Sequence, residues 1–133
     1  MNRKKSIGYT LIAEYFKSNH QKPFPFQEMT WDAINNGESG LVNAPTGMGK
    51  TFAIFLGALI QFIDQHPNEF HTKRNNGQQL LWITPLKALV KDLARAMENT
   101  LDSLQIPWQV GIRTGDTTTQ ERLQQKNNYR KFY

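Results

Sequence analysis

The segment Ala44-Pro45-Thr46-Gly47-Met48-Gly49-Lys50-Thr51 carries the residue types that a nucleotide phosphate requires. Gly47 and Gly49 let the backbone curl so that its N–H groups face inward, where a Cβ would clash. The Lys50 ammonium can reach the β- and γ-phosphates, and the Thr51 hydroxyl can ligate Mg²⁺. The pattern predicts binding of ATP with magnesium, with these residues as contacts: Thr46, Gly47, Met48, Gly49, Lys50 and Thr51.

The context of this loop agrees with the pattern. The preceding residues, 39–43, read as a short buried strand, and the apolar run that follows reads as a helix to about Gln65. The other interpretation is a glycine turn between strand and helix, with Lys50 merely solvated. The loop does not name the reaction, because kinases, ATPases and helicases share it.

The form Ala-x-x-Gly-x-Gly-Lys-Thr resembles the phosphate loop of superfamily 2 helicases of the DEAD/DEAH-box kind. Upstream, Phe24-Pro25-Phe26-Gln27 resembles their Q motif, which implies that Gln27 reads adenine. An amide can donate to N7 of adenine and accept from its N6 amine, and Phe24 or Phe26 can pack on the ring. Without the resemblance, Gln27 reads as an ordinary residue near a helix start.

Two further segments resemble nucleic-acid contacts of these helicases. Thr84-Pro85-Leu86-Lys87 is similar to motif Ia, where free N–H groups and Lys87 can meet a backbone phosphate. Arg113-Thr114-Gly115-Asp116 is similar to a motif of the Lhr-like branch that lies near the bound strand. Alone, the first reads as a proline-started helix with a solvated lysine and the second as a capped surface turn.

Composition narrows the class of protein. The 133 residues are 38% hydrophobic and 20% charged, which is a globular balance. No cysteine is present, so a disulfide framework and a thiolate metal site are excluded, and the three histidines read as surface residues. The net charge of +5 favours polyanion partners, with a solvated basic surface as the alternative. No apolar run approaches the roughly 20 residues of a membrane span, so we expect a cytoplasmic protein.

Apolar spacing predicts the elements that must position these motifs. Helices are expected at 6–18, 27–35, from the phosphate loop to 65, from Pro85 to about 104, and at 119–126. Strands are expected at 39–43, 80–84 and 108–113. This alternation predicts an α/β fold with a parallel sheet flanked by helices, whose ligands lie at the carboxyl ends of the strands. All three polar motifs fall at such ends.

The resemblance implies a partial RecA-like P-loop NTPase domain. We expect N-terminal helices with the Q-motif-like segment at 1–36, the ATP-binding domain at 37–126 and a tail outside the family pattern at 127–133. The whole run resembles the ligase-associated DEXH-box DNA helicases of bacteria. That likeness favours DNA over RNA and implies an ATP-dependent DNA ligase and a repair nuclease as partners.

The chain departs from the family after residue 126. No Asp-Glu-x-His motif and no second motor domain follow, so no catalytic residue is assigned and no ATPase activity is expected of these residues alone. Asn127–Tyr133 lies where Leu-Pro-Glu-Ile-Leu is expected, and a shift of the reading frame would explain the difference. The alternatives are a self-standing P-loop nucleotide-binding module and another P-loop NTPase, such as a nucleotide kinase.

Overall fold

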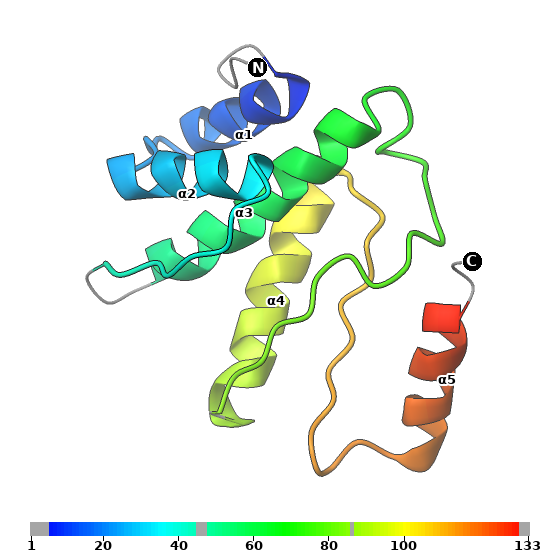
Figure 1. Cartoon of the computed structure of the whole chain (residues 1–133). Coiled ribbons are helices and arrows are strands. Elements are labelled where there is room, and N and C mark those ends of the chain that lie inside the picture. The colour runs from blue at the N-terminus through cyan, green and yellow to red at the C-terminus, as the bar shows by residue number, and fades with distance from the viewer. Residues whose placement is uncertain (1–5, 45–47, 86, 131–133) are drawn as a thin grey trace. The chain divides into compact units, whose positions relative to one another are not determined.

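The computed structural model describes residues 6–44, 48–85 and 87–130, and in these residues the chain forms five helices joined by loops (Figure 1). The helices are α1 (Ile7–Ser18), α2 (Pro25–Asn35), α3 (Met48–Gln65), α4 (Lys87–Leu104) and α5 (Thr119–Arg130). They are divided between two compact units, Met1–Phe70 and His71–Tyr133. Each helix matches one that the sequence predicts, with bounds that differ by a few residues.

Helix α1 begins at a side-chain cap. The Ser6 hydroxyl accepts a hydrogen bond from the Tyr9 N–H at 3.0 Å, which satisfies one of the free donors at the helix start. This first turn lies against α3, where the Asp64 carboxylate accepts from the Gly8 N–H at 2.7 Å. A Cβ at Gly8 would lie 2.6 Å from the Ile60 carbonyl oxygen, so only glycine permits this approach of the two backbones.

Helix α2 packs on α3 and completes the first unit (Figure 1). Trp31 is buried, and its ring meets those of Phe16 and Tyr9 at centroid distances of 5.8 Å and 6.1 Å. Helix α3 supplies most of the buried apolar side chains of this unit: Ala53, Phe55, Leu56, Leu59, Ile60, Phe62 and Ile63. Burial of this apolar area is the main stabilising term of the unit. Phe70 is buried as well, although the sequence places it in a polar surface loop.

In the second unit, α4 and α5 are joined by an extended loop. Four residues from the middle of α4 onward are buried: Ala94, Met97, Thr100 and Leu101. Leu89, in the N-terminal half of the same predicted apolar stripe, is 52% exposed. Helix α5 begins with a complete capping box, in which Thr118 N–H donates to the Glu121 carboxylate and Glu121 N–H donates to the Thr118 hydroxyl.

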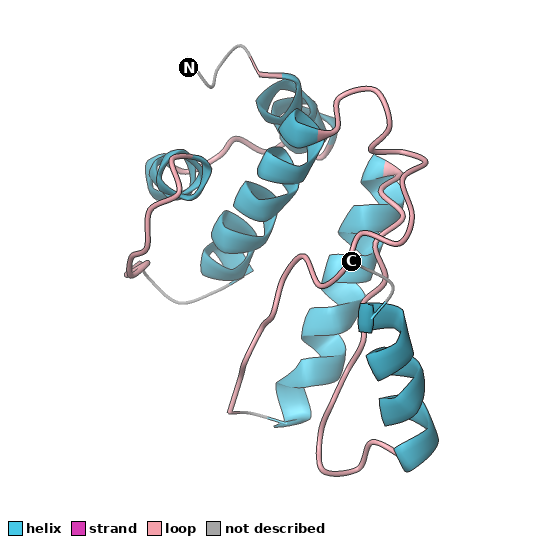
Figure 2. Ribbon diagram, turned by 45° about the vertical axis from the view of Figure 1, so that its right-hand side comes forward, coloured by secondary structure: helices cyan, strands magenta, loops and turns pink. Residues whose placement is uncertain are grey.

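The predicted strands are not formed in the described part of the chain. Residues 39–43, 80–84 and 108–113 are loop there, and Figure 2 shows only helix and loop. Leu41 and Ile83 are consequently 91% and 83% exposed. A strand needs neighbours to pair its N–H and C=O groups, and two strands alone are marginally stable. The parallel sheet therefore stays a prediction for these segments.

The domain bounds expected from the sequence stay predictions. Helices α1 and α2 belong to the same unit as the helix that follows the phosphate loop, because both contact α3. Helix α5 continues to Arg130, so part of the expected tail is helical. Among the helices described, none combines the length and the apolar character that crossing a membrane would need.

Candidate functional site

The phosphate-loop segment ends in the first turn of α3. Gly49, Lys50 and Thr51 lie in that turn, and each is partly exposed. The first four N–H groups of a helix have no acceptor within the helix, and the helix dipole makes this end favourable for an anion. Of the predicted contacts, Thr46 and Gly47 lie outside the described residues, and only the backbone of Met48 is described.

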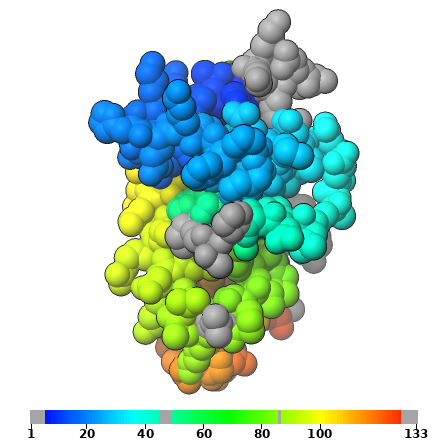
Figure 3. Space-filling view, turned by 90° about the vertical axis from the view of Figure 1, so that its left-hand side faces the viewer, coloured from blue at the N-terminus to red at the C-terminus, as the bar shows by residue number. Residues whose placement is uncertain are grey.

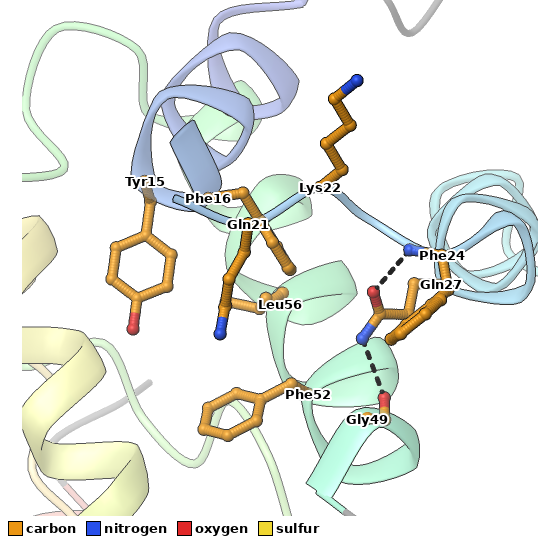
Figure 4. A pocket seen from close by; sticks show the side chains of 9 residues that line it. All are labelled: Tyr15, Phe16, Gln21, Lys22, Phe24, Gln27, Gly49, Phe52 and Leu56. Atoms are coloured by element: carbon orange, nitrogen blue, oxygen red, sulfur yellow. Dashed lines mark hydrogen bonds between the residues drawn. The ribbon is translucent and has the colours of Figure 1, made fainter. Parts of the chain in front are cut away.

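Gln27 connects α2 to this first turn (Figure 4). Its Nε2 donates to the Gly49 carbonyl oxygen at 3.1 Å, and its Oε1 accepts from the Phe24 N–H at 2.9 Å. The second bond is half of a capping box, because Gln27 is the third residue of α2 and Phe24 has no side-chain acceptor. Gln27 is 3% exposed, so it is a buried structural residue as well as a candidate contact for adenine.

Gly49 makes this close approach possible. A Cβ at this position would lie 3.3 Å from Cζ of Phe26 and 3.7 Å from Nε2 of Gln27. The first distance is shorter than ordinary van der Waals contact, so a side chain here would push on the start of α2. The Q-motif-like segment and the phosphate-loop helix thus come close together at Gly49, where a side chain would be crowded.

A cavity of about 530 Å³ opens beside Gln27. It is lined by Tyr15, Phe16, Gln21, Lys22, Phe24, Gln27, Gly49, Phe52 and Leu56. Figure 4 shows Tyr15, Gln21 and Phe52 directed toward one space, whereas the Lys22 ammonium points away from it. The size and the lining, in which four aromatic side chains stand beside a few polar groups, are typical of a small-molecule pocket.

The two phenylalanines predicted to pack on adenine stack on each other. The rings of Phe24 and Phe26 are 5.9 Å apart and inclined by 13°. Phe24 lines the cavity and is 61% exposed, so its face is available to a planar ligand. In the space-filling view, the atoms of α2 and those of the residues that follow it form one uninterrupted surface (Figure 3).

Sequence reasoning missed six of the residues that line the cavity. Tyr15 and Phe16 belong to the apolar spacing that predicts α1, and Phe52 and Leu56 to the apolar run that predicts α3. Gln21 and Lys22 come from the connection between α1 and α2. The one available signal is the i, i+4 spacing of Phe52 and Leu56, which places both on one face of α3 with Gly49 a turn before them.

The metal position has a single candidate ligand in the part of the chain that the structure describes. Thr51 offers a hydroxyl oxygen, the hard donor that Mg²⁺ prefers. Described residues include no group of three or more histidine, aspartate or glutamate side chains that could hold a metal by themselves. A magnesium ion here would therefore be bound mainly by nucleotide phosphates, which is how such ions are usually held.

In the second unit, an ion pair joins the two segments that resemble nucleic-acid contacts. The Lys87 ammonium, in the first turn of α4, contacts the Asp116 carboxylate. Thr84 and Pro85 precede this turn directly, and Leu86 lies outside the described residues. Both partners are exposed, with side-chain exposures of 63% and 74%. Lys87 donates a hydrogen bond and contributes its charge, which together hold the pKa of Asp116 below its usual range, and Lys91 adds to this.

The turn at 113–117 is held against α5 by side-chain hydrogen bonds. The Arg113 guanidinium donates to the Gln125 amide oxygen and to the Arg122 carbonyl, each at 3.2 Å. Arg122 in return donates to the Thr114 carbonyl at 3.2 Å. Within the turn, Thr114 N–H donates to the Thr117 hydroxyl, so the threonines fix its shape.

Comparison with known proteins places the chain among helicases. The family model for DEAD/DEAH box helicases matches residues 24–132. An Lhr helicase of Mycolicibacterium smegmatis is 36% identical over 124 residues, which cover 84% of this chain and 8% of that protein. The "Lhr helicase/uracil glycosylase" of Escherichia coli is 34% identical over 86% of this chain and 8% of its own length. The "ATP-dependent helicase Lhr-Core" of Sulfolobus acidocaldarius is 34% identical over 84% of this chain and 13% of its own length.

The chain thus spans about a tenth of the length of these relatives. No solved structure gives a significant match.

Proposed function

Because the chain belongs to the DEAD/DEAH box helicase family, we propose that it supplies the ATP-binding part of an ATP-dependent DNA helicase. The observation that carries the proposal is the contact between Gln27 and the first turn of α3. It joins a group that can recognise a base to a helix start that can hold phosphates. A RecA-like α/β fold, with a parallel sheet behind this site, is part of the same proposal.

The amide of Gln27 retains the capacity to bind a base. An amide has two N–H donors and two oxygen lone pairs, and the bonds to Phe24 and Gly49 use one of each. One donor and one acceptor remain, and this is the pair that N7 and the N6 amine of adenine require. Guanine presents acceptors at both N7 and O6, so it would leave the free lone pair of Gln27 opposed by another acceptor. We therefore propose that adenine lies in the cavity, with Phe24 or Phe26 against its ring.

The phosphates would lie at the start of α3. Backbone N–H groups of Gly47, Met48 and Gly49, together with the Lys50 ammonium, would hold them, with Thr46 alongside. Thr51 would contribute its hydroxyl to Mg²⁺, which neutralises phosphate charge when it is bound.

We propose that the second unit contacts the nucleic-acid backbone. Thr84, Pro85, Leu86 and Lys87 would do so at the start of α4, and the turn of Arg113, Thr114, Gly115 and Asp116 would lie beside the same strand. The ion pair of Lys87 and Asp116 supports one continuous surface, because it brings the two segments into contact. DNA is the proposed partner. An ATP-dependent DNA ligase and a repair nuclease stay predictions for the full-length protein.

Nucleotide competition tests this proposal. A fluorescent ATP analogue is bound to the chain in the presence of Mg²⁺ and displaced with ATP or GTP. We expect ATP to displace it at a concentration at least about tenfold lower than GTP, since a mismatched buried acceptor costs about 1–3 kcal/mol. Lys50→Ala should weaken the binding of both nucleotides. Equal displacement by the two nucleotides would favour another P-loop NTPase, and no binding of the analogue would contradict the proposal.

A further inference from the structure

Two cations beyond the helicase-like segments lie beside the pair of Lys87 and Asp116. Lys91 follows Lys87 by one turn of α4, so both side chains lie on the same face of the helix. Its charge adds to that of Lys87 in lowering the pKa of the Asp116 carboxyl. Arg122 on α5 reaches the turn through its bond to the Thr114 carbonyl. All four cations of this cluster, Lys87, Lys91, Arg113 and Arg122, are exposed.

The arginines keep donors for a further ligand. A guanidinium carries five N–H groups, and the hydrogen bonds described above engage Nε and Nη2 of Arg113 and Nη2 of Arg122. Because these bonds run to α5 and the turn, the guanidinium groups are held in place before a ligand arrives, which lowers the entropy lost on binding. Gln125 strengthens the frame by donating to the Ile112 carbonyl at 2.9 Å.

We propose that Lys87, Lys91, Arg113 and Arg122 form one phosphate-binding surface for a nucleic-acid backbone, and that Asp116 is its internal counter-ion, displaced from Lys87 when a phosphate binds. This inference rests on the proposed nucleic-acid contact of the second unit. It adds that the Asp116 carboxylate competes with the phosphate for Lys87. An exposed ion pair contributes little net stability, so the exchange of one anion for another on Lys87 is inexpensive. The Glu121 carboxylate, in the first turn of α5, accepts a hydrogen bond from the Thr118 N–H.

The test removes the counter-ion without changing the shape of the side chain. Binding of a fluorescent oligothymidylate to the whole chain is followed by anisotropy at several salt concentrations. Asp116→Asn should bind about fivefold more tightly at low salt, the effect of one unit charge a few ångströms from a phosphate. Its affinity should also fall more steeply with salt, because Lys87 then meets the phosphate without first losing a protein partner.

The matched control is Asp102→Asn. It makes the same change in net charge near the other end of α4, about 22 Å from Lys87 along the helix axis. This variant should bind less than twofold more tightly, since exposed charges at that distance are screened. The double variant Lys87→Ala/Asp116→Asn should lose most of the gain.

Three outcomes decide the matter. A gain confined to Asp116→Asn and dependent on Lys87 supports the counter-ion. If the wild-type chain binds DNA and Asp116→Asn binds no more tightly than Asp102→Asn, the counter-ion is overturned and the nucleic-acid contact stands. If neither the wild-type chain nor Asp116→Asn binds DNA, both the contact and the counter-ion are overturned.

Discussion

The Gln27 side chain donates a hydrogen bond to the Gly49 carbonyl oxygen, 3.1 Å away, across the junction of α2 and α3. The contact is between a residue that resembles an adenine reader and a glycine of the phosphate loop. The contact holds the two halves of the proposed site together. One donor and one acceptor of the Gln27 amide remain for a base. The other donor and acceptor bond to the Gly49 carbonyl and the Phe24 N–H.

Gln27→Ala tests the structural half of this arrangement. The change leaves the Phe24 N–H and the Gly49 carbonyl without their side-chain partner. We expect the free energy of unfolding to fall by about 1–3 kcal/mol, the usual effect of buried groups that lose a hydrogen bond. Urea denaturation measures it. Gln65→Ala, at the exposed end of α3, is the control and should change stability by less than about 0.5 kcal/mol. Equal effects of the two variants would contradict a structural part for Gln27.

Gly49→Ala separates binding from stability. Alanine favours the helix by up to about 1 kcal/mol, while its Cβ would lie 3.3 Å from Cζ of Phe26. The two effects oppose each other, so we expect little change in unfolding. Affinity for the ATP analogue should fall at least about tenfold, because a Cβ hinders the approach of phosphate to the backbone. Gly40→Ala, where a Cβ would meet nothing within 4 Å, should leave affinity unchanged. Unaltered binding by Gly49→Ala would count against phosphates at this turn.

Gly8→Ala should destabilise the first unit. Its Cβ would lie 2.6 Å from the Ile60 carbonyl oxygen, and a backbone atom cannot move aside. We expect a loss of about 1–3 kcal/mol, as for other overpacked sites. The comparison variant is Gly57→Ala, whose Cβ would lie 2.7 Å from Cδ1 of Ile34, the flexible end of a side chain. It should cost less in the same urea titration. A larger loss for Gly57→Ala would show that α1 does not pack on α3 as described.

The hydroxyl of Tyr9 predicts a dependence of stability on pH. Burial, and then the hydrogen bond that it donates to the Glu28 carboxylate, raise the pKa of Tyr9 from 10.0 to about 12. Ionisation is thus harder in the folded chain than in the unfolded one. The resulting stabilisation is fully present below the unfolded pKa of about 10 and is lost as the pH rises through about 12.

Tyr9→Phe measures this contribution. The difference in unfolding free energy between wild type and variant should be constant, at about 0.5–1.5 kcal/mol, up to about pH 10. It should then shrink toward more alkaline pH. Lysines that titrate in the same range affect both chains equally and cancel in the difference. A difference that stays constant to about pH 12 would show that the Tyr9 pKa is not raised.

The helices could be predicted because their signals are local. The apolar spacing of α1, the proline at the start of α2 and the turn residues after it are all contained in short stretches of sequence. The strands depend on partners far along the chain, and the three expected segments are loop in the described structure. Their exposed side chains, among them Leu41 and Ile83, mark where that expectation and the observed fold differ.

The candidate site could be predicted in part. The residue types of the phosphate loop and of Gln27 point to their chemistry without any structure. The burial of Gln27 and its bond to Gly49 could not be foreseen, because they depend on the packing of α2 on α3. The same holds for the cavity, whose wall at Tyr15 and Gln21 is brought there by the turn between α1 and α2.

Nuclear magnetic resonance of the whole chain, titrated with ATP and Mg²⁺, tests the central claim most directly. We predict that the backbone amide signals of Gly49, Lys50 and Thr51 and the side-chain amide signal of Gln27 shift together, with one saturation curve. Signals of α5 should stay in place, and Lys50→Ala should require a much higher ATP concentration. Shifts that leave Gln27 and the first turn of α3 unmoved, or no saturable shift at all, would contradict nucleotide binding at this junction.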